Sequence, residues 1–572
     1  MDEIKRLAYL YLTANGVLMK RPFDPPRNDP ALPTHYITTA PVSLVPGRFD
    51  KAAYERAVAV QPYYNRVYNA IGNAPEFLRW VVEELLDGSD PFITNLYAIY
   101  VADMAEYGRE RIQLNLNRSD YLEHINNTNI NTTTDAGGNT NCGGYELKQV
   151  EFNTVSVSFA SFAQQVSEMH RFLVQQMAGT PFYTDYFGQI KIDPDQMPDN
   201  SKVIATIAEG LFKAATLYSQ EYCGVTHENT NTNTAILLVE QENEHNVFDQ
   251  QLLEITLWRL YGVKTYRKNL MQIHEALQLP INRDQLKDVV DDGICDSEKQ
   301  QKPRRRLFIE NTEISVVYFR SCYTPKDFII NNSGDGEDWN QKWQVRKELE
   351  HRLATKVPNV GYQLAGMKKV QQILTQPGIL TRFLGDDQQA LNLIESTFMR
   401  MYSFDSDPQQ VLDTHIFTSN KDGAENNVPF VLKPQREGGG GFNIYGKDIE
   451  KFVAKYRQQN SDRQDELYHV LKGYILMELI NVPKHDKSSI FFDKDNRAIV
   501  VDHDSISELG IFGVYLSIED GNDTDNGKST PFQQQSVVIN KVAGHLLRSK
   551  SSNENEGGVA AGFAVLDSPI LF

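Results

Sequence analysis

Two cations, one carboxylate and four consecutive glycines stand within nine residues of this chain, between Lys433 and Gly441. Apolar residues 430–432 precede this run and Phe-Asn-Ile-Tyr follows it at 442–445, which predicts a strand, a glycine-rich loop and a second strand. Because glycine has no side chain, the backbone N–H groups of such a loop can close over a polyphosphate as a mobile lid. A flexible surface linker would explain the glycines, but not a lysine and a glutamate at the mouth of the loop.

A second polar set lies in the segment Glu-Phe-Asn-Thr-Val-Ser-Val-Ser at 151–158, where polar and apolar residues alternate. We expect one strand here, with Glu151, Asn153, Ser156 and Ser158 on a shared polar face. Carboxylate and amide oxygens two residues apart suit Mg²⁺, which commonly shares its ligand shell with substrate phosphates. Glu437, in the glycine-rich run, is the natural third ligand. The alternative is an ordinary half-exposed strand with a polar outer face.

Further cations stand near both ends of the chain. Arg118 follows the alternating residues 114–117, which predicts a strand end where its guanidinium could hold a carboxylate. A surface ion pair with Asp120 is the alternative interpretation. Arg548 and Lys550 stand two residues apart and could face one ligand, and the small residues at 557–562 would allow a close backbone approach.

Composition indicates a large globular protein with an acidic surface. The 572 residues, with 41% hydrophobic and 23% charged, could form roughly three to four domains. The net charge of −18 repels nucleic acids and anionic membranes, so neither is an expected partner. An anionic substrate must therefore be bound by a local cluster of cations.

The sequence contains no other strong catalytic motif. The four cysteines are far apart, which argues against a disulfide framework or a thiolate zinc site and favours a reducing, cytoplasmic location. No histidine pair has metal-ligand spacing and no Gly-x-Ser-x-Gly occurs. Cys322, beside Arg320, is interpreted as a thiol without a catalytic role. No secretory signal or membrane span is expected.

The elements that must position these residues can be read from periodicity. The buried run 235–239, a helical stripe at 247–260 and a second strand at 263–266 predict a βαβ crossover, and 314–320 predicts a further strand of the same unit. The first 120 residues favour helices, as at 77–86. Segments 474–479 and 510–518 predict an antiparallel sheet around the glycine loop. The fold class is therefore mixed α/β. The Asn/Thr-rich residues 126–141 are expected to be disordered.

Several blocks together resemble the eukaryotic glutathione synthetases, an ATP-grasp ligase family. They are KPQREGGG with the following NIYG, EFNTVSVSF, QLAGMKKVQQ at 363–372, SELGIFGVY, HLLRSK and GGVAAGFAVLD. They occur in order from about residue 114 to 568. Three departures stand out: four glycines followed by Phe442-Asn443 in place of three glycines followed by Asn-Asn, Ser321-Cys322 in place of Asp-Gly, and Glu556 in place of Asp.

The resemblance implies an ATP-grasp fold, a homodimer, and the joining of γ-glutamylcysteine to glycine with ATP and Mg²⁺. It implies an antiparallel core with a glycine-rich lid and an inserted parallel α/β substrate domain. The implied regions are 1–234 (first part of the core), 235–367 (inserted domain), 368–507 (ATP-binding and lid region) and 508–572 (remainder of the core).

The resemblance also implies roles for individual residues, grouped by ligand. The magnesium ligands would be Glu151, Asn153 and Glu437. The nucleotide would be held by Glu151, Lys368, Lys433, Glu437, Gly438, Gly439, Gly440, Gly441, Tyr445, Met477, Glu478, Leu479, Ile480, Glu508, Lys550 and Glu556. The substrate positions would be Arg118, Ser156, Ser158, Glu244, Asn246, Gln250, Arg320, Tyr323, Arg548, Val559 and Ala560. The catalytic cations would be Arg118, Arg548, Lys368 and Lys433.

Two alternative functions stay open at the level of sequence. The same chemistry could use another amino acceptor, such as β-alanine or serine, because one methylene changes binding by only ~1–3 kcal/mol. A non-catalytic nucleotide sensor is the other alternative, and the intact Glu151, Asn153, Glu437, Lys368 and Lys433 argue against it.

Overall fold

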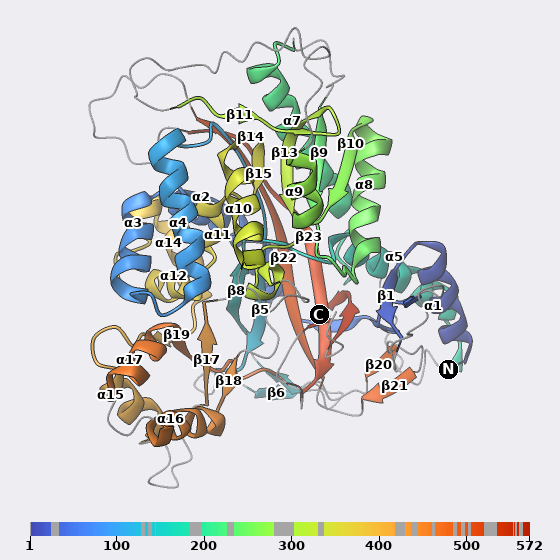
Figure 1. The fold of residues 1–572 in the computed structure, drawn as a ribbon. Helices are drawn as coiled ribbons and strands as arrows, with labels where there is room; N and C mark the ends of the chain where they lie inside the picture. Colours follow the sequence, from blue (N-terminus) through green and yellow to red (C-terminus); the bar gives the residue numbers. More distant parts are fainter. Residues whose placement is uncertain are drawn as a thin grey trace.

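The computed structural model describes most of the chain in helices and strands arranged around one long sheet (Figure 1). The described residues are 2–23, 34–126, 132–134, 140–142, 145–181, 196–225, 234–278, 302–329, 337–417, 429–435, 443–459, 464–483, 489–492, 498–501, 505–519, 535–552, 554, 558–559 and 564–572. The helices are α1 (Asp2–Ala14), α2 (Lys51–Gly72), α3 (Pro75–Arg79), α4 (Pro91–Tyr107), α5 (Ala160–Met177), α7 (Val203–Tyr222), α8 (Val247–Tyr261), α9 (Leu270–Gln278), α10 (Glu337–His351), α11 (Val360–Ala365), α12 (Lys368–Leu374), α13 (Thr381–Leu384), α14 (Gln388–Ser396), α15 (Pro408–Leu412), α16 (Lys447–Gln459) and α17 (Gln464–Lys472).

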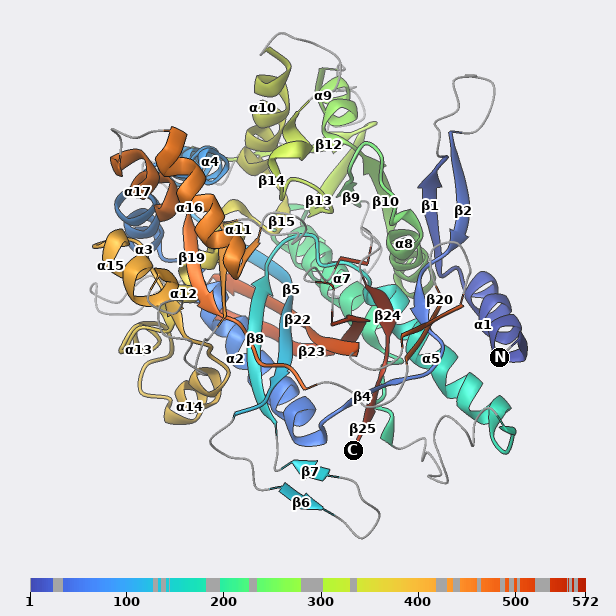
Figure 2. The same cartoon turned by 90° about the horizontal axis from the view of Figure 1, so that it is seen from below.

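The central sheet has eight strands in the order β21-β20-β3-β24-β23-β22-β5-β8, and all neighbours except β24 and β3 are antiparallel. Its longest members, β22 and β23, cross the middle of the molecule (Figure 2). The strand expected at 510–518 is confirmed and is antiparallel to its neighbours, but residues 474–478 lie in a different sheet, so the expectation of one antiparallel sheet that contains both segments is wrong. The strands are β3 (Val42–Ser43), β5 (Ile112–His124), β8 (Glu146–Asn153), β20 (Ser489–Phe492), β21 (Ala498–Val501), β22 (Ser505–Glu519), β23 (Gln535–Ser551) and β24 (Val565–Asp567).

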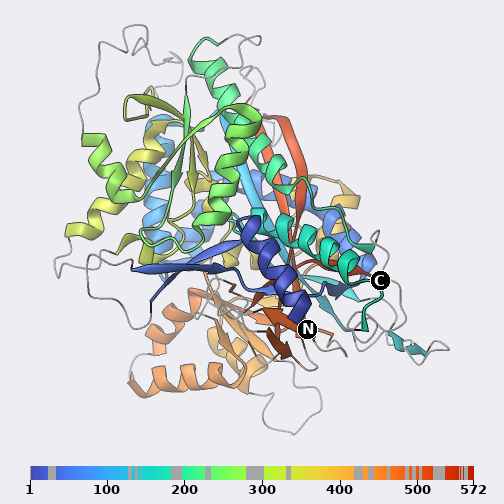
Figure 3. The same ribbon diagram turned by 90° about the vertical axis from the view of Figure 1, so that its right-hand side faces the viewer.

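A second sheet is built from parallel strands. It contains β10 (Lys264–Lys268), β9 (Ala235–Val239), β13 (Thr312–Phe319) and β15 (Thr355–Val357), with the short β12 (Phe308–Ile309) antiparallel at one edge. Helix α8 connects β9 to β10, so the predicted βαβ crossover is confirmed. This unit, green in Figure 3, packs on one side of the central sheet.

The strands predicted to flank the glycine-rich run form a third, antiparallel sheet. Its order is β16 (Met401–Tyr402), β19 (Tyr474–Glu478), β17 (Phe430–Pro434) and β18 (Ile444–Tyr445). The prediction of strand, loop and strand is therefore confirmed at both strands. The intervening residues 436–442, which include Glu437 and Gly438–Gly441, lie outside the described residues.

Smaller elements complete the fold. The predicted helical segment 77–86 is helical throughout, as α3 and then a π-helix at Trp80–Leu86. Part of the Asn/Thr-rich segment, expected to be disordered, pairs as β6 (Thr132–Thr134) with β7 (Thr140–Cys142), in line with the strand preference of threonine. The remaining paired strands are β1 (Leu18–Pro22) with β2 (His35–Thr39), β4 (Gly47–Phe49) with β25 (Pro569–Leu571), and β11 (Arg305–Arg306) with β14 (Arg352–Leu353). In the described chain, no helix is long and apolar enough to cross a bilayer.

Strand β5 divides two environments because its side chains alternate. Leu114 and Leu116 face α7, where a Cβ on Gly210 would lie 3.4 Å from Leu114. The opposite face carries Tyr121, which packs in the cluster formed around α2. The polar residues between these positions need partners in a buried setting, and α2 supplies them.

A ladder of buried amides joins α2 to the central sheet. From Asn69 Nδ2 a hydrogen bond of 2.9 Å runs to Gln535 Oε1, and Asn69 Oδ1 accepts from Asn115 Nδ2 at 2.8 Å. Asn73 and Gln113 exchange two bonds of 2.7 and 2.8 Å. We call this set the amide ladder. Its members are Gln61, Asn65, Asn69, Asn73, Gln113, Asn115, Asn117, Gln535 and Asn540.

Replacing Asn69 by alanine is expected to lower the free energy of unfolding by about 2–3 kcal/mol, because Asn115 loses its acceptor and Gln535 loses a donor in a buried setting. Urea denaturation measures the effect. The matched control is Asn392→Ala, which removes an exposed amide bond to Gln388 on α14 and should change stability by less than about 0.5 kcal/mol. Equal losses in the two variants would contradict the importance of the ladder.

Candidate active site

One face of the central sheet carries a row of charged side chains on four neighbouring strands. In the register of the sheet, Arg118 lies opposite Asn153 and Asp120 lies opposite Glu151, where β5 pairs with β8. Glu508 lies opposite Arg548, where β22 pairs with β23. The alternation that directs amides toward α2 therefore directs these charges to the other face. We call these residues, together with Lys368 and Lys433, the charged row.

The two arginines of the charged row share one carboxylate, that of Asp120. Asp120 accepts from Arg118 Nε at 2.6 Å and from Arg548 Nη2 at 3.0 Å, and Arg548 also pairs with Glu508. Arg118 was expected at a strand end, with a surface ion pair as the alternative. Both interpretations are wrong: Arg118 lies in the middle of β5, and its side chain is only 7% exposed.

Two lysines approach this row from other elements. Lys368 begins α12 and its Nζ lies 2.8 Å from Glu151 Oε2, and Lys433 of β17 donates to the carbonyl of Val150 at 2.8 Å. Gln435 Oε1 accepts from the Lys369 N–H at 2.7 Å, which ties the start of the glycine-rich run to α12. Glu151 and Lys433 are thus close together in the fold, although more than 280 residues separate them in the sequence.

Burial and charge act in opposite directions on the ionisable groups. Burial alone would raise the pKa of Glu151, but the charges of Lys368 and Lys433 bring this pKa well below its usual range. Burial, with the nearby charge of Lys368, lowers the pKa of Lys433 to about 8. Burial raises the pKa of Glu508 although Arg548 and Lys550 oppose this. Two oppositely charged groups in one dry space stabilise each other's ionised forms.

The described part of the row carries a small positive excess. The cations are Arg118, Arg548, Lys368 and Lys433, and the carboxylates are Asp120, Glu151 and Glu508, which leaves one positive charge. The predicted local cluster of cations in an acidic chain therefore exists. These cations are already buried and paired with carboxylates in the folded protein. A bound polyphosphate would therefore meet positive charge whose desolvation cost is already offset by these partners.

Two of the three predicted metal ligands lie on one face of β8. Glu151 and Asn153 are two residues apart, as expected, and their neighbours across the strand pair are Asp120 and Arg118. Their carboxylate and amide oxygens fit a hard cation such as Mg²⁺. Within the residues that are described, no group of three His, Cys, Asp or Glu side chains is arranged to hold a metal. Convergence with Glu437 stays a prediction.

The two serines of the 151–158 segment reach the site in a way the sequence did not indicate. The expected single strand ends at Asn153, and Ser156 adopts a left-handed backbone with φ of 51°. Positions 156 and 158 are also an odd number of residues from 153. In a continuous strand, the side chains of both serines would therefore point to the face opposite to that of Glu151 and Asn153. The break instead lets the Ser158 carbonyl accept from Arg118 Nη1 at 3.2 Å.

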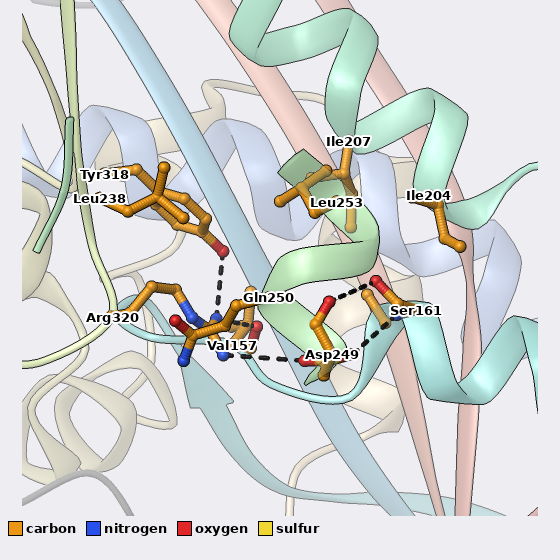
Figure 4. A pocket seen from close by; sticks show the side chains of 11 residues that line it. Val157, Ser161, Ile204, Ile207, Leu238, Asp249, Gln250, Leu253, Tyr318 and Arg320 are labelled. Atoms are coloured by element: carbon orange, nitrogen blue, oxygen red, sulfur yellow. Dashed lines mark hydrogen bonds and ion pairs between the residues drawn. The ribbon is translucent and has the colours of Figure 1, made fainter. Parts of the chain in front are cut away.

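Arg320, Asp249 and Gln250 line one pocket, where Arg320 and Asp249 point toward each other (Figure 4). Arg320 donates to Ser158 Oγ at 2.9 Å and to the Val157 carbonyl at 2.6 Å, while Ser156 Oγ donates to the Arg320 carbonyl at 3.1 Å. Asp249 lies 3.9 Å from Arg320 Nη2. Ser158 therefore connects Arg320, which directly follows β13 of the parallel sheet, to Arg118 of the central sheet.

The loop before α8 and its first turn supply the other polar side chains of this group. Asn246 donates to Asp249 at 3.2 Å, and Gln250 donates to Glu244 at 2.7 Å. Glu244, Asn246 and Gln250 are therefore brought together with Arg320 as expected. Tyr323 accepts from Gln241 at 3.0 Å, in the segment that follows Arg320. Burial raises the pKa of the Cys322 thiol to about 12, which agrees with the expected inert thiol.

An apolar cluster lies beside Lys433, where the resemblance places the adenine. Met477 packs with Val431 and Ile475, and Tyr445, Leu479 and Ile480 pack against this cluster. Lys433 Nζ lies 3.9 Å from Met477 Sδ, and Tyr402 donates to Glu478 at 3.0 Å.

Val559, a predicted substrate position, is buried near the C-terminus. Glu437, Gly438, Gly439, Gly440, Gly441, Glu556 and Ala560 lie outside the described residues, and their roles stay predictions.

Sequence reasoning missed two buried carboxylates of this region. Asp120 was treated only as a surface partner of Arg118, although its position two residues further along the same strand indicates the same face. Asp249 was not singled out. Its oxygens accept from the N–H groups of Phe159, Ser161 and Phe162 at the start of α5, a contact between distant segments that carries no local signal.

Comparison with known proteins gives one consistent family. The model described as "Eukaryotic glutathione synthase, ATP binding domain" matches residues 1–571. Glutathione synthetases from Dictyostelium discoideum and Bos taurus are 29% and 31% identical over the whole chain, which spans 99% and 96% of their lengths. A chloroplastic glutathione synthetase from Solanum lycopersicum is 32% identical over 93% of this chain and 78% of its own.

A solved structure shares the fold. It is a glutathione synthetase-like effector from Globodera pallida in its apo form, with a TM-score of 0.62 and 18% identity, and the match covers 100% of this chain and 96% of that one. The expected mixed α/β fold class is thereby confirmed for the chain as a whole.

Asp249→Ala is expected to lower the free energy of unfolding by about 3–5 kcal/mol, because it removes the acceptor for three N–H groups and the charge beside buried Arg320. Urea denaturation measures the change. The control is Asp387→Ala, which removes a partly exposed cap of α14 and should cost about 1 kcal/mol. Equal effects of the two changes would show that the connection between α8 and α5 adds nothing beyond an ordinary cap.

Proposed function

Because the chain belongs to the eukaryotic glutathione synthase family, we propose that the charged row is the site at which it joins γ-glutamylcysteine to glycine with ATP. The chain is an enzyme of the ligase class, and its product is glutathione. The observation that carries the site assignment is the meeting of four largely buried cations from four distant segments with Glu151 and Asn153.

The chemistry requires activation of a poor electrophile. The γ-phosphoryl group of ATP passes to a carboxylate oxygen of the cysteinyl residue, which gives an acyl phosphate and ADP. The unprotonated amine of glycine then attacks the acyl carbon, phosphate leaves, and an amine proton is released as the amide forms. Positive charge that surrounds the transferring group lowers the barrier because it stabilises negative charge that develops there.

Each cation has a proposed task that follows from its position. Lys368 and Lys433 hold the phosphates of ATP, next to the apolar cluster around Met477 that receives the adenine. Arg118 and Arg548 hold the reacting carboxylate and steady the oxyanion. Arg320, with Ser156 and Ser158, binds the dipeptide, and the hydrogen bonds of Ser158 to both Arg118 and Arg320 support one site that holds the dipeptide next to the reacting carboxylate.

The remaining positions of the family pattern are assigned from the resemblance to that family. On the nucleotide side these are Tyr445, Glu478, Leu479, Ile480, Glu508, Lys550 and Glu556, with Gly438–Gly441 as a lid that excludes water from the acyl phosphate. On the dipeptide side they are Glu244, Asn246, Gln250, Tyr323, Val559 and Ala560.

Magnesium is the proposed metal, held by Glu151, Asn153 and Glu437. The oxygen-only donor set and the single-face placement of Glu151 and Asn153 support this assignment. When bound, the ion supplies charge that offsets the phosphate oxygens. Glu151 is suited to this task because its low pKa keeps it ionised.

We also propose a cytoplasmic homodimer that needs neither nucleic acid nor membrane. Large apolar side chains support a protein contact: Ile37 on β2 is 61% exposed and Trp258 on α8 is 66% exposed. Strand β1, the partner of β2, packs against α8, so the two exposed residues belong to neighbouring elements.

The assay that tests the function measures phosphate release by the purified protein. Release is expected only when ATP, Mg²⁺, γ-glutamylcysteine and glycine are all present, with glutathione formed in equal amount. Release independent of the dipeptide would remove the synthetase assignment, and no release would favour a nucleotide sensor. A higher kcat/KM with β-alanine or serine than with glycine would assign a different amino acceptor.

Affinity for ATP is expected to fall at alkaline pH. Lys433 is charged below its pKa of about 8 and neutral above it, so the Kd for ATP should be about tenfold higher at pH 9 than at pH 7. Equilibrium dialysis at both pH values provides the measurement. Lys433→Met should bind ATP weakly at both pH values without this dependence. The same pH dependence in the variant and in the wild type would contradict the role of Lys433.

A further inference from the structure

The carboxylate of Asp120 is the shared acceptor of three residues that come from three different strands. Arg118 of β5, Asn153 of β8 and Arg548 of β23 all donate to it. We propose that Asp120 is a positioning residue for the ligation, which sets the places of both arginines before substrate arrives. This inference rests on the proposed function of the charged row and adds a residue outside the family pattern described above.

The geometry leaves the carboxylate little freedom. Arg118 donates through Nε to Oδ1 at 2.6 Å and through Nη2 to Oδ2 at 2.8 Å, as a two-point pair. Oδ2 also accepts from Arg548 Nη2 and Asn153 Nδ2, both at 3.0 Å. The Asp120 side chain is 0% exposed. Two guanidinium groups are thus held side by side by one fixed negative charge, although they would otherwise repel each other.

Strand β22 lies between Asp120 and Arg548, and it carries a glycine where these two residues meet. Gly510 of β22 lies opposite Asp120, and a Cβ at this position would lie 2.7 Å from Arg118 Cδ and 2.8 Å from Asp120 Oδ1. Any side chain on Gly510 would therefore push these groups aside. Glycine at this position lets Arg548 reach across β22 to the aspartate of the next strand.

Asp120 is assigned to positioning and not to proton transfer. Both of its oxygens already accept from guanidinium groups, so a proton would have to displace charge-assisted bonds. Its contribution is orientation: displacement of a reacting group by about 1 Å can lower the rate about 100-fold. Both arginines are proposed to hold the reacting carboxylate, so their loss of position should affect the dipeptide more than the nucleotide.

The test is D120N, compared with the wild type in steady-state kinetics. Asparagine keeps the shape, but its NH₂ group must face guanidinium donors in either orientation. We expect kcat to fall about 100-fold and the KM for γ-glutamylcysteine to rise about tenfold, while the KM for ATP changes less than about threefold. A purely structural defect would reduce the active fraction and leave both KM values unchanged. That result would overturn the proposal.

Two further variants make the result independent of folding and of lost charge. G510A removes no charge and should give the same pattern, because its methyl group displaces Arg118 and Asp120. D567N is the matched control: Asp567 is a buried carboxylate of β24 that accepts from Ser549, Gly47 and Ser568, all uncharged donors. D567N should retain kcat and both KM values within about threefold.

Failure of this inference and failure of the proposed function give different results. A wild-type protein that forms no glutathione from ATP, the dipeptide and glycine removes the proposed function. An active wild type together with D120N and G510A that keep the wild-type kcat and dipeptide KM removes only the role of Asp120.

Discussion

Burial of many charges in one small volume is the constraint on which the rest of this structure depends. An isolated ion in a protein interior costs several kcal/mol, and the cost is offset only when partners of opposite charge have good geometry. Here Arg118, Arg548, Lys368 and Lys433 meet Asp120, Glu151 and Glu508. The architecture has to bring each member close to the others from segments hundreds of residues apart, because a single missing partner would leave an uncompensated charge.

The central sheet meets this demand through its strand order and its period of two. Strands β8, β5, β22 and β23 are neighbours, so the charges of one face form a row. Along β5, the face that holds Arg118 and Asp120 also packs on α7 through Leu114 and Leu116. The opposite face is occupied by α2. A shift of one residue in register would exchange the two faces, with charges against α2 and amides in the site.

Much of the fold could be predicted from the sequence because local patterns carry it. The buried run 235–239, the apolar strand before Lys433 and the shared face of Glu151 and Asn153 are all found as expected. The failures lie where tertiary contacts decide. Ser156 and Phe159 adopt positive φ values that alternation cannot indicate, and the burial of Arg118 depends on pairing with β22, where its partner Phe512 comes 394 residues later. Asp249 caps a helix other than its own.

The amide ladder between α2 and the sheet has a consequence for how the sequence can vary. Most of its side chains both donate and accept, and the members bond mainly to one another. Replacing one member by an apolar residue leaves the buried polar groups of its neighbours without hydrogen-bond partners. Replacing two facing members together by an apolar pair of the same shape can avoid this cost. We therefore expect related proteins either to keep the whole amide ladder or to have replaced facing members of it together.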